Sequence, residues 1–372
     1  MAKDIIKLGD VATYINGYAF KPEDRGEEGL QIIRIQDLTG NSYDLGFYNG
    51  KYPKKIEIND GDVLISWSAS LGVYVWNGGK ALLNQHIFKV KFDKVDIDKS
   101  YFVYAVRYKL NDMGKKTHGA TMKHIVKRDF DATEIPYPPL KKQIEIAINL
   151  DKVLMVIKER KRELKLLDEL IKARFVELFD GKYPEDTLLN LCNIVDYRGK
   201  TPEKVEHGLP FITAKNVKMH HMTLEPREYI SKETYDKVMV RGFPKEGDVV
   251  FTTEAPLGNV CRIPHFDTEF YIGQRIVTMQ TDALNPTYLE YALSDEEFVR
   301  KYMGKSSGST VTGIRVRLLQ QLTIPVPART LQDEFSTFVN QVDKSKFDTM
   351  TFAPIYAIIN LYLHTYFYQG RR

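Results

Sequence analysis

The stretch Gly-Asp-Val-Leu-Ile-Ser at residues 61–66 decides the fold, because it returns as Gly-Asp-Val-Val-Phe-Thr at residues 247–252. Three further segments recur in the same order. Gly-Leu-Gln-Ile-Ile-Arg at 29–34 matches Gly-Leu-Pro-Phe-Ile-Thr at 208–213, Gln-His-Ile at 85–87 matches Gln-Arg-Ile at 274–276, and Ile-Pro-Tyr-Pro at 135–138 matches Ile-Pro-Val-Pro at 324–327. The shift between copies drifts only from 179 to 189 positions. One unit of about 180 residues therefore occurs twice.

The runs between turn residues predict an α+β fold for each copy. Short strands bounded by Gly, Asn or Asp are expected at 31–35, 62–66, 87–92, 248–252 and 276–280. Asn285, Pro286 and the apolar run that follows predict an N-capped helix with a first-turn proline. Asn285-Pro286-Thr287-Tyr288 also resembles the Asn-Pro-Pro-Tyr motif of adenine methyltransferases. Its second proline is missing, and we interpret it, like residues 98–101, as a helix start.

Residues 140–179 contain neither Gly nor Pro and predict one helix of about 60 Å. Arg160 and Arg174 interrupt an otherwise apolar seam of heptad spacing, which is typical of a coiled coil. The alternative is a helix packed along a globular domain. The seam residues, predicted to pair with a second helix, are Leu150, Val153, Ile157, Leu164, Leu167, Ile171 and Leu178.

The expected partner helix follows the second copy. Val339 and Val342 align with Leu150 and Val153, but the pattern decays beyond Phe347, and Pro354 predicts a break or kink. The sequence thus predicts a first domain at 1–139, a central helix at 140–180, a second domain at 181–328 and a C-terminal helix at 329–372, irregular after about 347.

This arrangement resembles the specificity subunits of type I restriction-modification systems. The resemblance covers residue 7 to about residue 346, and is carried by Lys7-Leu8-Gly9-Asp10-Val11, the duplicated Gly-Asp-Val motif and the two Ile-Pro-x-Pro junctions. It implies two target recognition domains, each reading one half of a split double-stranded DNA sequence. It further implies that the long helices form an antiparallel coiled coil that separates the domains.

The same resemblance implies the partners. The helices would dock two methyltransferase subunits, and restriction subunits would join through the complex. The chain itself would be non-catalytic and hold no cofactor, with S-adenosylmethionine, ATP and Mg on the partner subunits. Consistent with this, the sequence has no Gly-rich loop suited to S-adenosylmethionine, and its eight scattered histidines form no metal signature.

Candidate DNA contacts come from positions with base-reading or phosphate-binding side chains. Most lie in two matching glycine-bounded segments, 114–124 and 304–313, and in matched positions after the predicted strands. The alternatives are solvated surface loops and strand residues that point into the core. In the first domain the candidates are Arg34, Gln36, Ser66, Trp67, Ser68, Lys115, Lys116, His118, Thr121 and Lys123. In the second they are Arg198, Lys200, Thr213, Lys215, Thr252, Thr253, Glu254, Lys305, Ser306, Ser307, Thr310, Thr312 and Arg315.

Composition bounds these interpretations without deciding them. In 372 residues, 53 Lys and Arg against 49 Asp and Glu give a net charge of +4, which neither requires nor excludes a nucleic-acid partner. Cys192 and Cys261 are too few for a disulfide framework or a zinc site, and predict small buried side chains.

The N-terminal residues lack a signal-peptide pattern, and Pro354, Asn360 and His364 interrupt the apolar stretch at 350–368. We therefore expect a cytoplasmic protein with no membrane partner. Two other functions stay open: a stand-alone DNA methyltransferase or nuclease with a cryptic site, and a scaffold that binds only proteins.

Overall fold

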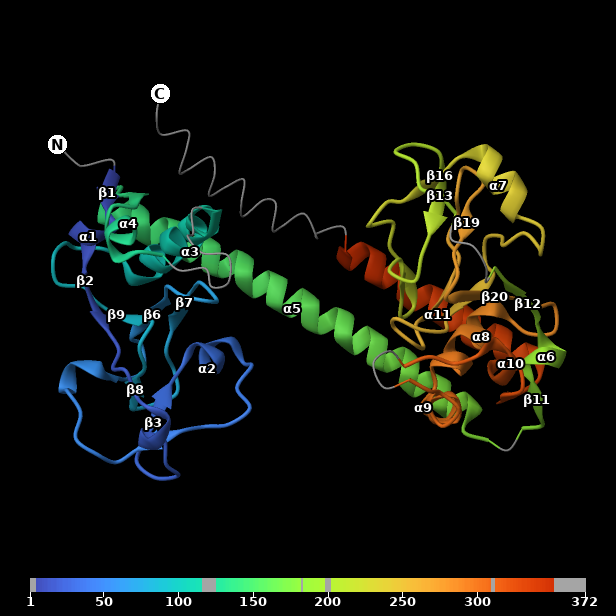
Figure 1. Cartoon of the computed structure of the whole chain (residues 1–372), viewed down its shortest axis with the longest axis horizontal. Helices are drawn as coiled ribbons and strands as arrows, with labels where there is room; N and C mark the ends of the chain where they lie inside the picture. The colour runs from blue at the N-terminus through green and yellow to red at the C-terminus, as the bar shows by residue number, and fades with distance from the viewer. Residues whose placement is uncertain (1–4, 116–124, 182, 198–201, 309–311, 351–372) are drawn as a thin grey trace. The chain divides into compact units, whose positions relative to one another are not determined.

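The computed structural model describes residues 5–115, 125–181, 183–197, 202–308 and 312–350 (Figure 1). The chain divides into two compact units, and the boundary between Lys161 and Arg162 lies inside helix α5 (Leu140–Phe179). We call the described residues on either side of this boundary the first and the second module. Each is described by itself.

The first module is built from two four-stranded sheets and a short antiparallel pair, β1 (Ile5–Lys7) with β10 (Glu134–Pro136). One sheet is antiparallel, in the order β2 (Thr13–Asn16), β9 (Ile87–Lys91), β6 (Val63–Ser66) and β7 (Gly72–Val75). The other has the order β4 (Phe47–Tyr48), β3 (Leu30–Ile33), β8 (Ala81–Leu83) and β5 (Glu57–Ile58), with β3 and β8 parallel. Its helices, besides its part of α5, are α1 (Leu8–Val11), α2 (Ile35–Thr39), α3 (Lys99–Lys115) and α4 (Lys127–Asp131).

The second module repeats this plan. β11 (Glu185–Thr187) pairs with β21 (Thr323–Pro325), and an antiparallel sheet has the order β12 (Asn193–Asp196), β20 (Ile276–Gln280), β17 (Val249–Thr252) and β18 (Val260–Arg262). A smaller sheet joins β16 (Tyr229–Ile230), β13 (Leu209–Ile212) and the parallel β19 (Tyr271–Ile272), beside the hairpin β14 (Val217–Lys218) and β15 (His221–Met222). Its helices, besides its part of α5, are α6 (Leu188–Leu191), α7 (Lys232–Val238), α8 (Pro286–Ser294), α9 (Glu296–Met303), α10 (Val316–Leu319) and α11 (Arg329–Met350).

The backbone confirms the predicted duplication. Two matched pairs of non-glycine residues take the uncommon left-handed conformation: Ala69 with Ala255 (φ 56° and 51°), and His86 with Arg275 (φ 71° and 76°). Of the predicted strands, β20 has the expected bounds. The strand expected at 31–35 is instead β3, which ends at Ile33 because the next residue caps α2.

Glutamines in the first turns of α5 and α11 explain why an Ile-Pro-x-Pro segment precedes each helix. The amide oxygen of Gln143 accepts a hydrogen bond from the backbone N–H of Asp98 (2.9 Å), and its amide nitrogen donates to a carbonyl in the proline segment (2.8 Å). Gln332 makes the same pair of bonds, with the N–H of Asn285 (2.8 Å) and a proline carbonyl (2.8 Å). Both glutamines are buried, so each helix start is fixed to its module.

The Asn-Pro-Thr-Tyr segment is a helix start, as predicted. The Asn285 side chain accepts a hydrogen bond from the backbone N–H of Thr287 (2.9 Å), and Pro286 opens α8. Tyr288 is fully buried, and its hydroxyl donates to the carbonyl of Pro325 (2.6 Å). Asn285 and Tyr288 therefore stabilise the fold by capping α8 and by packing in the core.

Helix α5 has the predicted bounds, and every predicted seam residue on it is buried or half-buried. The described packing departs from the prediction at Leu150. This residue lies in the core of the first module with Ile146 and Ala147, so among the described residues it packs against that module and not against α11. The alternative, a helix packed along a globular domain, is correct there, because the neighbouring apolar residues belong to that domain.

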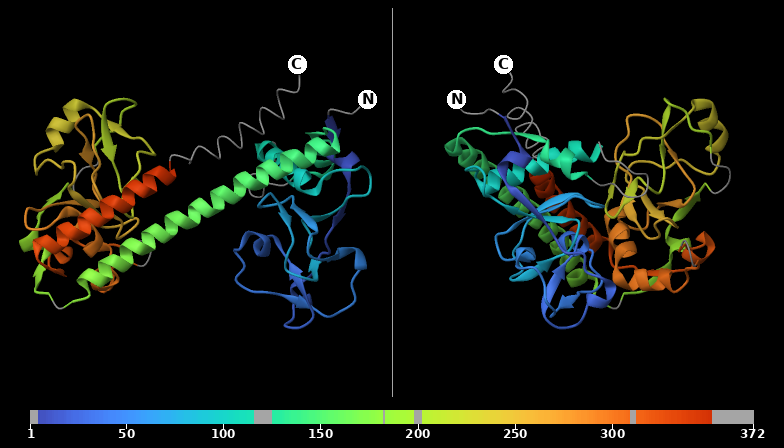
Figure 2. Two further views of the ribbon diagram at one scale, coloured as in Figure 1. Left: turned by 180° about the vertical axis from the view of Figure 1, so that it is seen from behind. Right: turned by 60° about the vertical axis from the view of Figure 1, so that its left-hand side comes forward.

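In the second module, the end of α5 packs antiparallel to α11 (Figures 1 and 2). Ion pairs join Asp168 to Lys346 (2.8 Å) and Arg174 to Glu334 (2.6 Å). Residue numbers on α11 therefore decrease along the pair as those on α5 increase, which makes the two helices antiparallel. Ile171 belongs to the same apolar core as α11. The Glu334 partner explains how an arginine is tolerated in the seam. The irregularity predicted after 347 does not begin before Met350, and the later tail lies outside the described residues.

The two cysteines are buried, as predicted. Burial raises the pKa of Cys192 and of Cys261 to about 12, so both thiols stay protonated and unreactive near neutral pH. None of the helices in the described ranges combines the length and the apolar character that crossing a bilayer requires.

Replacing Phe335 tests the junction between α5 and α11. Its fully buried ring contacts Phe175 and Phe179, with ring centres 5.4 and 5.5 Å apart. Phe335→Ala should lower the free energy of unfolding by about 3–5 kcal/mol, because it leaves a cavity in this core. Phe243→Ala is the matched control: that side chain is 63% exposed, and the loss should stay within about 0.5 kcal/mol in denaturant unfolding. Equal losses in the two variants would contradict this packing.

Candidate nucleic-acid interface

Three segments of the second module meet around a cavity of about 400 Å³. They are the end of β17, the residues before β20 and the loop before α10. Four predicted DNA contacts line the cavity, namely Thr253, Glu254, Ser307 and Arg315, together with Gln274 and Arg275. The last two were not among the predicted contacts. Their signal in the sequence was the matched dipeptide, Gln85-His86 in the first copy and Gln274-Arg275 in the second.

Backbone hydrogen bonds hold the walls of this cavity together. The N–H of Thr253 donates to the carbonyl of Arg275 (2.8 Å), and the N–H of Ile314 donates to the carbonyl of Thr253 (2.9 Å). Ser307 and Gly313 exchange a reciprocal pair (2.9 and 3.1 Å). A Cβ at position 313 would lie 3.1 Å from that of Glu254, so the close approach of the loop favours glycine. These backbone hydrogen bonds fix the positions of the side chains that line the cavity. We call the bonded segments at Thr253, Arg275 and Ile314 the frame of the cavity.

The cavity carries two guanidinium groups in different environments. Nε of Arg275 lies 2.7 Å from Oε1 of Glu254, and both side chains are about half exposed. Arg315 is exposed, and among the described residues no partner for its side chain is found. Lys305 and Thr312 are exposed on the same loop. Such donors suit the acceptor-rich edges of bases and the oxygens of phosphates.

The first module has the same frame with different side chains. The N–H of Trp67 donates to the carbonyl of His86 (3.2 Å), and the N–H of Ile125 donates to the carbonyl of Trp67 (2.9 Å), as the matching residues do in the second module. The Trp67 ring stacks on Phe88 with 5.7 Å between ring centres, and its edge meets His86 at 4.9 Å. An aromatic wall thus stands where the second module has Thr253.

Four of the predicted DNA contacts are wrong, because their side chains are buried. The hydroxyl of Ser66 donates to the carbonyl of Ser70 (2.5 Å), and that of Thr252 accepts from the N–H of Asn259 (2.9 Å). Both residues end strands that are buried at every position, so they lie in the core, the alternative left open by the sequence. Low exposure, at most 7%, removes four side chains from the candidate surface: Ser66, Ser68, Thr252 and Thr253.

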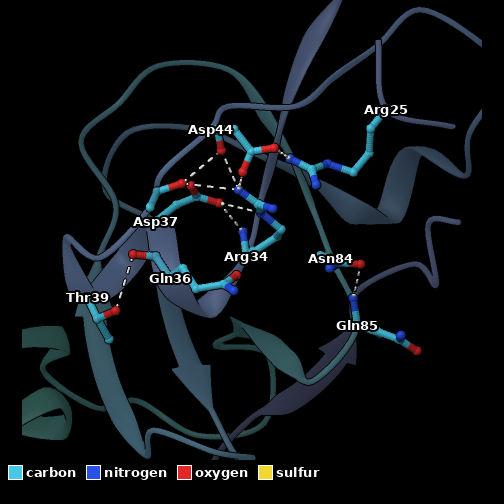
Figure 3. A network of polar contacts seen from close by, with 9 residues as sticks. Arg25, Arg34, Gln36, Asp37, Thr39, Asp44, Asn84 and Gln85 are labelled. Carbon is cyan, nitrogen blue, oxygen red and sulfur yellow. Dashed lines mark hydrogen bonds and ion pairs between the residues drawn. The ribbon is translucent and has the colours of Figure 1, made fainter. Parts of the chain in front are cut away.

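The prediction that Arg34 contacts DNA is also corrected, because its guanidinium binds side chains of its own module (Figure 3). Its Nε donates to Asp37 (3.3 Å), its Nη2 donates to Ser42 (3.1 Å), and the side chain is only 14% exposed. Asp44 bridges Arg34 to Arg25. The hydrogen bond from Arg25 is the main cause that lowers the pKa of the Asp44 carboxyl. Arg34 therefore holds the loop at 42–44 rather than facing a groove.

Gln36 remains a candidate, with Lys215 at the matching position. The Asp37 carboxylate caps the N–H of Arg34 (2.7 Å), just as the Asn216 side chain caps the N–H of Thr213 (2.9 Å). The hydroxyl of Thr213 also binds Asn216 (2.9 Å). Gln36 and Lys215 are both exposed on this repeated turn.

The two glycine-bounded segments are described only in part. Lys115 is the last residue of α3, so the first basic segment begins inside a helix. In the second segment the hydroxyl of Ser306 donates to the carbonyl of Met303 (2.8 Å), and Ser307 is exposed. The candidates that lie outside the described residues are Lys116, His118, Thr121, Lys123, Arg198, Lys200 and Thr310.

The fold and these matched loops define a class of protein: a recognition protein made of two homologous modules. Residues 3–166 match the family described as Type I restriction modification DNA specificity domain. The match lies on the first module and its part of α5, and the chain as a whole is similar to specificity subunits of type I restriction-modification systems.

Relatives of this chain span nearly its whole length. The EcoBI specificity subunit of Escherichia coli is 24% identical over 91% of this chain and 78% of its own. The MjaVIII specificity subunit of Methanocaldococcus jannaschii is 23% identical over 91% of this chain and 86% of its own. Among solved structures, the specificity subunit from M. genitalium has a TM-score of 0.58 at 14% identity, covering 98% of this chain and 95% of its own. A chain from a structural study of type I complex assembly has a TM-score of 0.56 at 18% identity, covering 97% and 96%.

Arg34→Ala tests the corrected role of this arginine. The change leaves Asp37 and the loop at 42–44 without their donor, so the free energy of unfolding should fall by about 1–3 kcal/mol in denaturant titration. Gln36→Ala, two residues away and exposed, should stay within about 0.5 kcal/mol. If Arg34→Ala keeps full stability and instead relaxes base choice, the original assignment as a base reader is right.

Proposed function

We propose that the two modules read the two halves of a bipartite double-stranded DNA target, each through the loops around its cavity frame. The observation that carries this proposal is the repeated frame with unlike side chains at matching positions. In the first module Trp67 and His86 occupy them, and in the second Arg275 stands beside the buried Thr253. A shared backbone can present each module to a groove in the same way. Different side chains on it would then select different base sequences.

Phosphate contacts would position each module on the duplex. In the second module the exposed cations Lys215, Lys305 and Arg315 suit this role, because none of them has a carboxylate partner among the described residues. Electrostatic attraction to phosphates is independent of sequence and supplies much of the affinity. Reading of bases then adds the specificity.

Helix α5 supplies a surface for partner subunits. In the first module Ile144, Ile148 and Met155 are 42–64% exposed on the side of α5 roughly opposite the seam, and in the second Leu166 and Leu170 are 53% and 48% exposed. Exposed apolar side chains in a row mark interaction sites. We propose that methyltransferase subunits, two in the complete complex, dock on this apolar row, and that restriction subunits join through them.

The remaining features of the proposed complex follow from this division of labour. The long antiparallel coiled coil, extending the pairing of α5 with α11, would hold the two modules at a fixed spacing on the DNA. Catalysis, with its S-adenosylmethionine, ATP and Mg, would belong to the partner subunits, in the cytoplasm. The buried Tyr288 and the capping Asn285 support this over a methyltransferase site in the chain itself.

Salt dependence tests DNA binding by phosphate contacts. Affinity of the complex for random duplex DNA should fall steeply as salt rises, and Arg315→Ala should weaken binding to all sequences alike and reduce the salt slope by about one. The control Arg329→Ala removes an exposed arginine that is paired with Asp333 on α11, and should change neither. An affinity that does not depend on salt would favour the alternative of a scaffold that binds only proteins.

Leu170→Glu tests the docking surface. Since this side chain is half exposed, the variant should keep its thermal stability yet lose co-purification with the methyltransferase subunit, because a carboxylate would be buried in the interface. Leu189→Glu, equally exposed on α6, should co-purify normally. Normal assembly of the Leu170 variant would place the docking surface elsewhere.

A further inference from the structure

Arg275 differs from Arg315, the other arginine that lines the cavity, because a carboxylate lies beside its guanidinium. The Glu254 carboxylate binds Nε, the inner edge of the guanidinium, at 2.7 Å. This ion pair lies on the Nε side of the planar guanidinium and restrains it, which leaves the outer edge with both Nη groups toward the cavity. Among the described residues, neither Nη group has a hydrogen bond, and Arg275 has no second carboxylate partner.

The backbone beneath Arg275 is equally constrained. Its φ of 76° is uncommon for a residue with a Cβ, and such conformations cluster at functional sites. The carbonyl of Arg275 accepts from Thr253, and the next residue, Ile276, is buried at the start of β20. The side chain therefore projects from a rigid strand end into the open cavity.

We propose that Arg275 is a specificity-determining residue that reads a guanine in the second half-site, with Glu254 as its positioning residue. The proposal rests on the function proposed above. Guanine presents O6 and N7 as adjacent acceptors in the major groove, and a pair of guanidinium donors matches them. Only the outer edge of Arg275 is needed for this contact.

Charge separates this role from phosphate binding. Glu254 offsets the positive charge of Arg275, which weakens a non-specific attraction to phosphate but leaves directional donors in place. Arg315, which lines the same cavity without such a carboxylate among the described residues, suits the phosphate role. In this proposal Arg275 reads a base, and Arg315 anchors the module to the phosphate backbone.

The first module lacks this pair. His86 stands at the matching position with the same left-handed backbone, and its ring meets the edge of Trp67. The position of Glu254 is taken by Ser68, which is 3% exposed. We therefore expect the guanine contact in one half-site only.

The test measures base preference with the complete complex of this chain and its methyltransferase subunits. Duplexes in which each position of both half-sites is varied are bound by the wild type and by Arg275→Ala, Arg275→Lys and Glu254→Gln. Arg275→Ala should lose a roughly 5- to 150-fold preference for guanine at one position of one half-site. Arg275→Lys should not restore it, because a point charge lacks the fork, and Glu254→Gln should give an intermediate loss.

The other outcomes overturn the proposal in distinguishable ways. Uniform weakening for all duplexes, as expected of Arg315→Ala, would make Arg275 a phosphate contact. Full base preference with altered thermal stability alone would make the pair a surface salt bridge. A wild type without preference in two separate half-sites would instead contradict the proposed function.

Discussion

The apolar face of α5 is buried in two different cores, and the rest of the structure depends on this sharing. Leu150 lies in the core of the first module, while Ile171 and Phe175 lie in the core of the second. At its start, Gln143 fixes the helix to the first module, and at its end Arg174 pairs with Glu334 of α11. One continuous helix is thus part of both folds. Neither core is complete without its segment of α5.

Duplication then accounts for the recognition surfaces. Each module fixes three loop segments with the same backbone hydrogen bonds, and each uses a left-handed residue at the same position, His86 or Arg275. Because the frame is made by backbone groups, side chains on it can change without changing the fold. This separation of frame from contact suits a protein whose task is to distinguish one DNA sequence from another.

The sequence was informative where periodicity and order carry the signal. Repeated motifs identified the two copies, and the absence of Gly and Pro with an apolar seam predicted the bounds of α5. Asn285 and Pro286 predicted the start of α8, because capping depends on neighbours in sequence.

Long-range partners could not be predicted in the same way. A seam residue such as Leu150 has the same pattern whether it meets a helix or a globular core. Arg34 has the residue type of a base reader, and only the fold brings Asp44 to its guanidinium. Ser66 and Thr252 are the last residues of β6 and β17, and the environment of each side chain depends on how these strands pair and pack in the sheet. Arg275 was missed because its partner Glu254 is distant in sequence.

The account as a whole claims that two modules examine one DNA molecule at two places. Mapping every methylated base in a cell that carries the assembled complex tests this most directly. It should yield two short conserved words separated by a gap of constant length and variable sequence. A single uninterrupted word, or methylation without a common sequence, would contradict the account.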